Sequence, residues 1–311
     1  MTQYVVPSDA RAAVLGHPVG HSRSPLLHAA AYKELNVPID YTAIDILPEQ
    51  AADFAQRLRT EPGWVGVSVT MPMKDALIPY IDEPSERVKR LGALNTIMVH
   101  HSSTGVRLAA ENTDIDGIVR ALALPRPTPG EPGPLLGILG NGNTALAALE
   151  ACALLGASRV ELLVRNPQRA TEVIALAQTL GLVLNVLPYT EGAPVLTHCD
   201  ALISTLPPRA ADTWLDPLGL PAASTPRSSA AAMTSIKPGA ILLDVAYDPW
   251  PSALATAWET AGGSVVSGLS MLVHQGLEQV KLFSRIQDAD WEHVTNVMCD
   301  AVGVPRPSSG S

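Results

Sequence analysis

Short apolar runs alternate along the chain with segments in which apolar residues recur at helical spacing, a pattern typical of an α/β protein. The apolar runs predict strands at 12–15, 41–46, 64–69, 97–100, 106–109, 135–139, 160–164, 185–187, 201–204, 241–245 and 264–266. The segments between them predict helices at 26–35, 48–59, 86–91, 118–122, 146–155, 170–180, 254–261, 268–283 and 291–302. Strands that alternate with helices favour open, mostly parallel sheets.

The segment 135–169 has the pattern of a dinucleotide-binding unit. A strand ends in a G-x-G-x-x-A loop, and a helix and a second strand follow. Glycines in such a loop permit a tight turn and let a pyrophosphate approach the backbone, and the helix N-terminus offers free N–H groups to the phosphates. We expect the loop to bind a nucleotide through Gly140, Asn141, Gly142, Asn143, Thr144 and Ala145. The alternative is a plain helix-capping loop.

The end of the second strand of this unit indicates which nucleotide is bound. An NAD site has an acidic residue there for the ribose hydroxyl, whereas this chain has Arg165, Asn166 and Arg169. Guanidinium groups bind phosphate with two parallel hydrogen bonds, so the pattern favours NADP, with the arginines on its 2′-phosphate. For Arg169 the alternative is a solvated position before the next helix. We also place Gly268 among the cofactor-binding residues.

Composition limits the class of protein. The 311 residues are enough for two domains with their own cores, and the net charge of −9 without a basic run argues against a nucleic-acid partner. The apolar runs are far shorter than a membrane span, and the first residues show no signal-peptide pattern. The three cysteines, Cys152, Cys199 and Cys299, are widely spaced and form neither a CxxC pair nor a disulfide framework. We expect a cytoplasmic protein, monomer or homodimer, that acts on a small molecule away from membranes.

Three histidines near the N-terminus, His17, His21 and His28, raise the question of a metal site. The prolines and glycines between them interrupt any regular ligand geometry, so we expect no metal.

Polar residues follow predicted strands in the N-terminal region, at the sheet edge where open α/β sheets bind ligands. Ser22 and Ser24 stand between a strand and a helix, Lys74 lies just past another strand, and Asp114 opens a helix. Each has a structural alternative: Ser24 as the N-cap before Pro25, Lys74 as a solvated surface lysine, and Asp114 as a first-turn acid favoured by the helix dipole.

Seven ordered motifs make the chain resemble the shikimate dehydrogenase family: GHPVGHSRSPLLHAAAY, GVSVTMPMK, GALNT, ENTDIDG, GNGNTA, DVAYDPWP and SGLSMLVHQG. The resemblance extends from residue 14 to about residue 283. It implies an open, mostly parallel α/β substrate domain, an inserted Rossmann domain that binds NADP, and an active site between them. We assign 1–113 and 268–311 to the substrate domain and 114–267 to the NADP domain, with a Pro/Gly-rich hinge at 125–134.

The resemblance also implies roles for individual residues. Lys74 and Asp114 match the catalytic pair of the family, and Ser22 and Ser24 match the serines that hold the substrate carboxylate. Further matches to substrate-binding positions are Thr70, Asn95, Tyr247 and Gln275. The implied activity is the reversible NADPH-dependent reduction of 3-dehydroshikimate to shikimate. Which member of the Lys74–Asp114 pair transfers the proton is left open.

Three positions depart from the family pattern. Ser68 stands where many members have asparagine, Asn143 replaces a glycine of the phosphate loop, and Asn166 replaces a threonine beside the phosphate-binding arginine. One alternative function is therefore a quinate or dual quinate/shikimate dehydrogenase that uses NAD. The other is a catalytically silent NADP-binding regulatory module, which we would expect to have lost Lys74 or Asp114.

Overall fold

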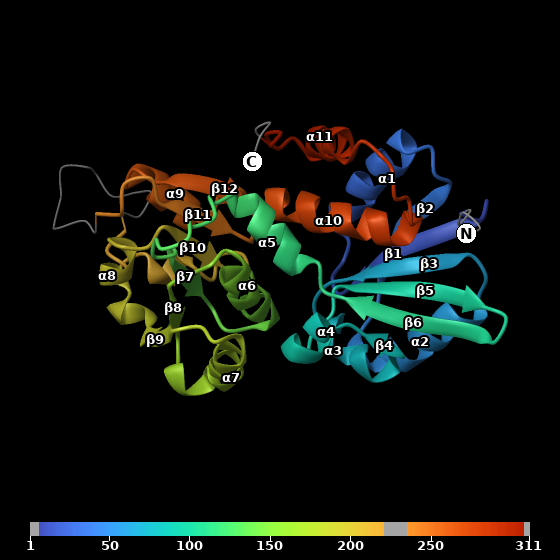
Figure 1. Cartoon of the computed structure of the whole chain (residues 1–311), viewed down its shortest axis with the longest axis horizontal. Coiled ribbons are helices and arrows are strands. Elements are labelled where there is room, and N and C mark those ends of the chain that lie inside the picture. Colours follow the sequence, from blue (N-terminus) through green and yellow to red (C-terminus); the bar gives the residue numbers. More distant parts are fainter. Residues whose placement is uncertain (1–5, 221–234, 308–311) are drawn as a thin grey trace. The chain divides into compact units, whose positions relative to one another are not determined.

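The computed structural model describes residues 6–220 and 235–307. The chain folds into two compact units, Met1–Gly117 with Leu272–Gly310 and Ile118–Met271. Each unit is built on one six-stranded sheet flanked by helices (Figure 1). The expected α/β class with two mostly parallel sheets is thereby confirmed.

The sheet of the first unit has the strand order β2-β1-β3-β5-β6-β4. Its strands are β1 (Ala10–Gly16), β2 (Ile39–Asp45), β3 (Trp64–Val69), β4 (Glu83–Pro84), β5 (Thr96–Ser102) and β6 (Gly105–Glu111). The first three strands are parallel, and β5 is antiparallel to both β3 and β6. The carboxyl ends of β1, β3 and β6 and the amino end of β5 consequently lie at one edge of the sheet.

The helices of this unit are α1 (Ser24–Glu34), α2 (Ala51–Thr60), α3 (Met73–Ala76), α4 (Glu86–Leu91) and α11 (Trp291–Val302), and the unit shares α5 (Asp114–Leu122) and α10 (Gly268–Ser284) with the second unit. In Figure 1, α1 and α11 lie on one face and α2 and α4 on the other. Residues of α1, α10 and α11 form one buried apolar cluster, and residues of α2 and α4 belong to another. Because a Cβ on Gly66 of β3 would lie 2.3 Å from the Phe283 ring, glycine is needed for α10 to pack this closely on the sheet.

All strands of the second sheet are parallel, in the order β12-β11-β10-β7-β8-β9. They are β7 (Leu135–Leu139), β8 (Arg159–Val164), β9 (Leu184–Pro188), β10 (Ala201–Ser204), β11 (Ile241–Asp244) and β12 (Ser264–Ser267). Between them lie α6 (Asn143–Leu154), α7 (Thr171–Leu180), α8 (Ala193–Leu196) and α9 (Ala253–Thr260). Numbered within this unit, the order is the 3-2-1-4-5-6 of a dinucleotide-binding fold, and it reverses direction between β7 and β10.

The structure corrects several expected elements. Helix α5 includes the residues from Asp114 onward that precede the expected range 118–122, and strand β5 extends past the expected range 97–100 to include His101. The short elements α3, β4 and α8 were not expected. The stretch 222–235 is rich in alanine, serine and threonine with little periodicity, which predicts a surface loop, but it lies outside the described residues except for Ser235. No helix in the described part of the chain is long and apolar enough to span a membrane.

Candidate functional site

The edge of the first sheet brings together loops that are distant in sequence. The backbone N–H of Thr70 donates to the Leu15 carbonyl at 2.8 Å, which joins the ends of β3 and β1. The N–H of Val69 donates to the Asn95 carbonyl at 2.7 Å, which joins β3 to the residue that precedes β5. The site residues that follow these strands are therefore held by the sheet itself.

Lys74 and Asp114 form a buried ion pair at this edge, through Nζ and Oδ2. Lys74 lies in the short helix α3 directly after β3, and Asp114 is the first residue of α5 after β6. Their relative exposures are only 8% and 6%. The interpretation of Lys74 as a solvated surface lysine is therefore wrong, and Asp114 has a charged partner in addition to its favourable place at a helix N-terminus.

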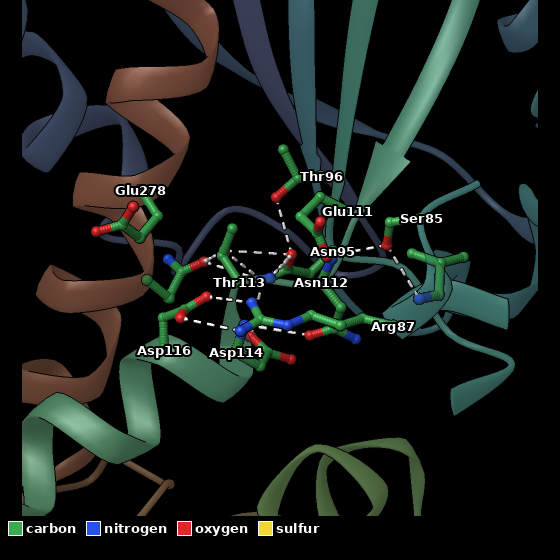
Figure 2. Close-up of polar contacts among 12 residues, drawn as sticks. Ser85, Arg87, Asn95, Thr96, Glu111, Asn112, Thr113, Asp114, Asp116 and Glu278 are labelled. Atoms are coloured by element: carbon green, nitrogen blue, oxygen red, sulfur yellow. Dashed lines mark hydrogen bonds and ion pairs between the residues drawn. The ribbon is translucent and has the colours of Figure 1, made fainter. Parts of the chain in front are cut away.

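Asn95 is the centre of the hydrogen bonding around this pair (Figure 2). Its Nδ2 donates to Asp114 Oδ1 at 2.9 Å, to Gln275 Oε1 at 3.1 Å and to Thr113 Oγ1 at 3.0 Å. Its Oδ1 accepts from the backbone N–H of Thr113 at 2.8 Å. Because a backbone N–H can only donate, this contact sets the orientation of the amide and directs its N–H₂ group toward Asp114.

The first turn of α5 is anchored on two sides. The Asn112 side chain accepts from the backbone N–H of Asp114 at 3.1 Å. Arg87 of α4 binds both carboxylate oxygens of Asp116, with Nη1–Oδ2 at 2.7 Å and Nη2–Oδ1 at 3.4 Å, a contact visible in Figure 2. These contacts restrain the backbone that carries Asp114.

The serines of the loop after β1 have roles that the sequence did not reveal. Helix α1 begins at Ser24 itself, and Ser22 Oγ accepts from the Ser24 N–H at 3.3 Å, so the interpretation of Ser24 as an N-cap is wrong. Both serines follow the carboxyl end of β1, and Ser24 is 5% exposed. Both serines therefore lie at the same sheet edge as the ion pair.

Two other predicted site residues also follow strand ends. Thr70 comes directly after β3 in the first unit and is half-buried. Tyr247 comes shortly after β11 in the second unit and is half-buried as well. Their contacts with a substrate stay predictions.

The loop after β7 in the second unit has the geometry of a phosphate cradle. Gly140 has φ +103°, and a Cβ there would lie 2.7 Å from Thr205 Oγ1, so the turn requires glycine. Gly142 differs, because a Cβ there would meet no protein atom within 4 Å. Helix α6 begins at the next residue with no side-chain cap and no acid in its first turn, so its N–H groups are open to an anion. The residues present thus fit a nucleotide pyrophosphate.

The tip of β8 presents two arginines. Arg165 and Arg169 are both exposed, and neither has a carboxylate partner within the described ranges. Asn166 caps the turn between them by accepting from the Gln168 N–H at 3.0 Å, and Asn141 donates to the Arg169 carbonyl at 3.0 Å. The second contact joins the glycine loop to the arginine segment.

Gly268 has a packing reason to be glycine. A Cβ there would lie 2.0 Å from the Val245 carbonyl oxygen, so the start of α10 can approach the end of β11 only without a side chain. A contact with the cofactor stays a prediction.

The N-terminal histidines have protein partners: His17 pairs with Asp45 at 2.6 Å, and His28 is fully buried beside Tyr32 and Gln279. The described residues contain no group of three or more side chains arranged to hold a metal ion.

Comparison with known proteins identifies the family. A family model described as the shikimate dehydrogenase substrate binding domain matches residues 14–97. Shikimate dehydrogenase (NADP(+)) from Desulfitobacterium hafniense is 32% identical over 267 residues, which are 85% of this chain and 89% of that protein. The chain belongs to the shikimate dehydrogenase family.

Solved structures of shikimate dehydrogenases share the fold. The enzyme of Mycobacterium tuberculosis superposes with a TM-score of 0.76 at 33% identity, over 94% of this chain and 99% of that chain. A shikimate 5-dehydrogenase from Thermus thermophilus, solved in complex with NADP(H) and shikimate, gives 0.70 at 28% identity, over 94% and 99%. The family predicted from the seven motifs is therefore confirmed.

Two residues of the site were not anticipated, Thr113 and Gln279. Thr113 joins Asn95 to Gln275, with its Oγ1 3.3 Å from Gln275 Oε1, and its place beside Asp114 in the ENTD motif was the available signal. Gln279 lies one helical turn after Gln275 and contacts the Asn95 carbonyl. A buried glutamine four residues after a site residue on one helix is a signal that the sequence did contain.

Proposed function

We propose that the protein catalyses the reversible NADPH-dependent reduction of 3-dehydroshikimate to shikimate. The observation that carries this proposal is the buried Lys74–Asp114 pair, joined through Asn95 to Gln275 at one edge of the first sheet. The relatives named above are shikimate dehydrogenases, which does not favour the quinate alternative. Both Lys74 and Asp114 are present, which argues against a silent regulatory module.

In this proposal the first unit binds the substrate. The hydroxyls of Ser22 and Ser24 are suited to the carboxylate, and Thr70, Asn95, Gln275 and Tyr247 are suited to the ring hydroxyls and their orientation. Neutral donors leave no unpaired positive charge when the site is empty.

Lys74 and Asp114 act on the carbonyl group. When the ketone is reduced, its oxygen gains negative charge, and an ammonium group at that oxygen stabilises the charge and can donate a proton. Asp114 holds the Lys74 ammonium group through one carboxylate oxygen and the Asn95 amide through the other. The pair is therefore positioned before the substrate arrives, which lowers the cost of ordering it during reaction.

The second unit would hold NADP. The phosphate loop from Gly140 to Ala145 would bind the pyrophosphate, and Arg165 and Arg169, with Asn166 between them, would bind the 2′-phosphate. When bound, NADPH supplies the hydride. The buried free cysteines agree with a reducing cytoplasmic setting, and a monomer or homodimer would serve this reaction equally well.

The proposal is tested by initial rates of nicotinamide absorbance change with shikimate or quinate, each with NADP or NAD. We expect turnover with shikimate and NADP, and rates at least tenfold lower with the other three pairs. Faster turnover of quinate with NAD would contradict the proposal.

A further inference from the structure

A continuous chain of buried side chains lies beneath the proposed substrate site. Tyr41 donates to Ser68 Oγ at 2.7 Å, and Ser68 donates to Gln279 Oε1 at 2.7 Å. Gln279 Nε2 donates to Thr96 Oγ1 at 3.0 Å, and Thr96 donates to Asn95 Oδ1 at 2.8 Å. Because Asn95 is bonded to Asp114, the chain joins Tyr41 of β2 to the ion pair.

The direction of each hydrogen bond in this chain is determined. Thr96 has one hydroxyl proton, which it gives to Asn95, so its remaining contact must accept a proton from the Gln279 N–H₂ group. The same group donates to the Asn95 carbonyl oxygen at 3.1 Å. Gln279 therefore holds Asn95 at two points, directly at the main chain and through Thr96 at the side chain.

The orientation of the Gln279 amide is determined from its other side. Its Oε1 accepts from Ser68 and lies 3.4 Å from His28 Nε2. Burial lowers the pKa of His28 to about 3, so the ring is neutral and carries one proton. A proton on Nε2 suits both contacts of the ring, because Nδ1 then accepts from the Tyr32 hydroxyl at 3.0 Å.

We propose that Gln279 is a positioning residue of the dehydrogenase reaction, acting through Thr96 and Asn95 on Asp114 and on the substrate hydroxyls. This inference rests on the function proposed above. Gln279 is 1% exposed and Thr96 is fully buried, so water cannot replace the lost contacts cheaply when either side chain is changed. A misoriented Asn95 would leave the Asp114 carboxylate with Lys74 as its remaining side-chain partner among the described residues.

The test is a double-mutant cycle on kcat/KM for shikimate, with Gln279→Met, Thr96→Val and the double variant. We expect Gln279→Met to lower kcat/KM at least tenfold and Thr96→Val to lower it several-fold, with the KM for NADP changed less than twofold. Because Gln279 and Thr96 both act through Asn95, the double variant should have the same kcat/KM as Gln279→Met alone. Thr96→Ser keeps the hydroxyl group and should retain the wild-type kcat/KM within about twofold.

A matched control is Thr295→Val, which removes another buried threonine hydroxyl, bonded to the Trp291 carbonyl in α11, and should leave kcat/KM unchanged. Urea unfolding of each variant separates loss of stability from loss of positioning.

Unchanged kcat/KM in folded Gln279→Met, or losses that multiply in the double variant, would overturn the inference. If Gln279→Met does not fold, wild-type kcat/KM in Thr96→Val overturns it. Absence of shikimate turnover in the wild-type protein would instead overturn the proposed function itself.

Discussion

At the scale of single residues, burial decides the behaviour of His28. Its ring is fully buried, stacked on Tyr41 with ring centroids 3.9 Å apart, and burial lowers its pKa from the ordinary 6.5 to about 3. At a pH between these two values, His28 is protonated in the unfolded chain and neutral in the folded protein. The free energy of unfolding is therefore highest above pH 6.5 and falls as the pH decreases toward 3.

We predict that His28→Gln, which keeps a donor without titrating, reduces this pH dependence. The contribution of His28 to the slope approaches about 1.4 kcal/mol per pH unit within that window. Urea unfolding between about pH 4 and pH 7, with His101→Gln as an exposed control in the same unit, measures the difference. Equal slopes for His28→Gln and wild type would contradict the assigned pKa.

Single residues were also where the sequence was least informative. Lys74 can be buried because it forms an ion pair with Asp114, forty positions later in the chain. The residues next to Lys74 in the sequence do not indicate this partner. An N-cap role was the structural alternative for Ser24, but helix α1 begins at Ser24 itself and Ser22 accepts from its N–H. Both outcomes depend on contacts made only in the folded protein.

At the scale of elements, local patterns predicted long structures and missed short ones. Strand β7 and helix α11 have the bounds that the hydrophobic pattern gave, because each has a continuous or periodic apolar face. Helix α3 has only four residues, too few to show a period, although it carries Lys74. Helix α5 extends before the expected range 118–122, and the Asn112 side chain accepts from the N–H of Asp114, its first residue.

The turn from β7 to α6 allows a prediction that separates binding from folding. Gly142 has an ordinary φ of −87°, and a Cβ there would meet no protein atom within 4 Å. We therefore expect Gly142→Ala to leave the Tm unchanged while raising the KM for NADP at least tenfold, because the methyl group occupies space meant for the pyrophosphate. The KM for shikimate serves as the internal control. An unchanged KM for NADP would show that the phosphates do not pass over this residue.

The anchoring of α5 leads to a second prediction at this scale. The Arg87 and Asp116 side chains, which form an ion pair, are 28% and 29% exposed. Arg87→Met removes this pair, so we expect a loss of about 1 kcal/mol of stability and a several-fold lower kcat. Lys89→Met removes the more exposed pair with Glu86 on α4 and should change neither quantity. Thermal unfolding and steady-state kinetics give both values. Equal effects of the two substitutions would argue against a role for Arg87 in holding Asp114.

At the scale of the whole molecule, the two units supply different parts of the proposed reaction. The ion pair and its hydrogen-bond network lie in the first unit, and the glycine loop and the arginines lie in the second. Cofactor selection should therefore change without loss of substrate binding. Replacing Arg165 and Arg169 together with glutamine should raise the KM for NADP at least tenfold and leave the rate with NAD and the KM for shikimate nearly unchanged. Retention of the wild-type KM for NADP would remove these arginines from the site.

The three cysteines give an independent check on the cores of both units. All are buried, and burial raises the pKa of Cys152 and Cys199 to about 12 and that of Cys299 to about 11. We expect the native protein to react slowly with a disulfide reagent at neutral pH and rapidly in urea, since only the thiolate attacks. Rapid release of the reporter thiol from the native protein would contradict this burial.

The most direct test of the proposed chemistry is kcat for Lys74→Met with shikimate and NADP. Methionine keeps most of the side-chain volume and removes the charge, so we expect kcat to fall by about 100-fold or more, with a smaller change in the KM for shikimate. Lys33→Met, at an exposed lysine of α1, is the matched control and should retain full activity. A kcat near the wild-type value in a folded Lys74→Met variant would contradict the assignment of Lys74 and Asp114 as the catalytic pair.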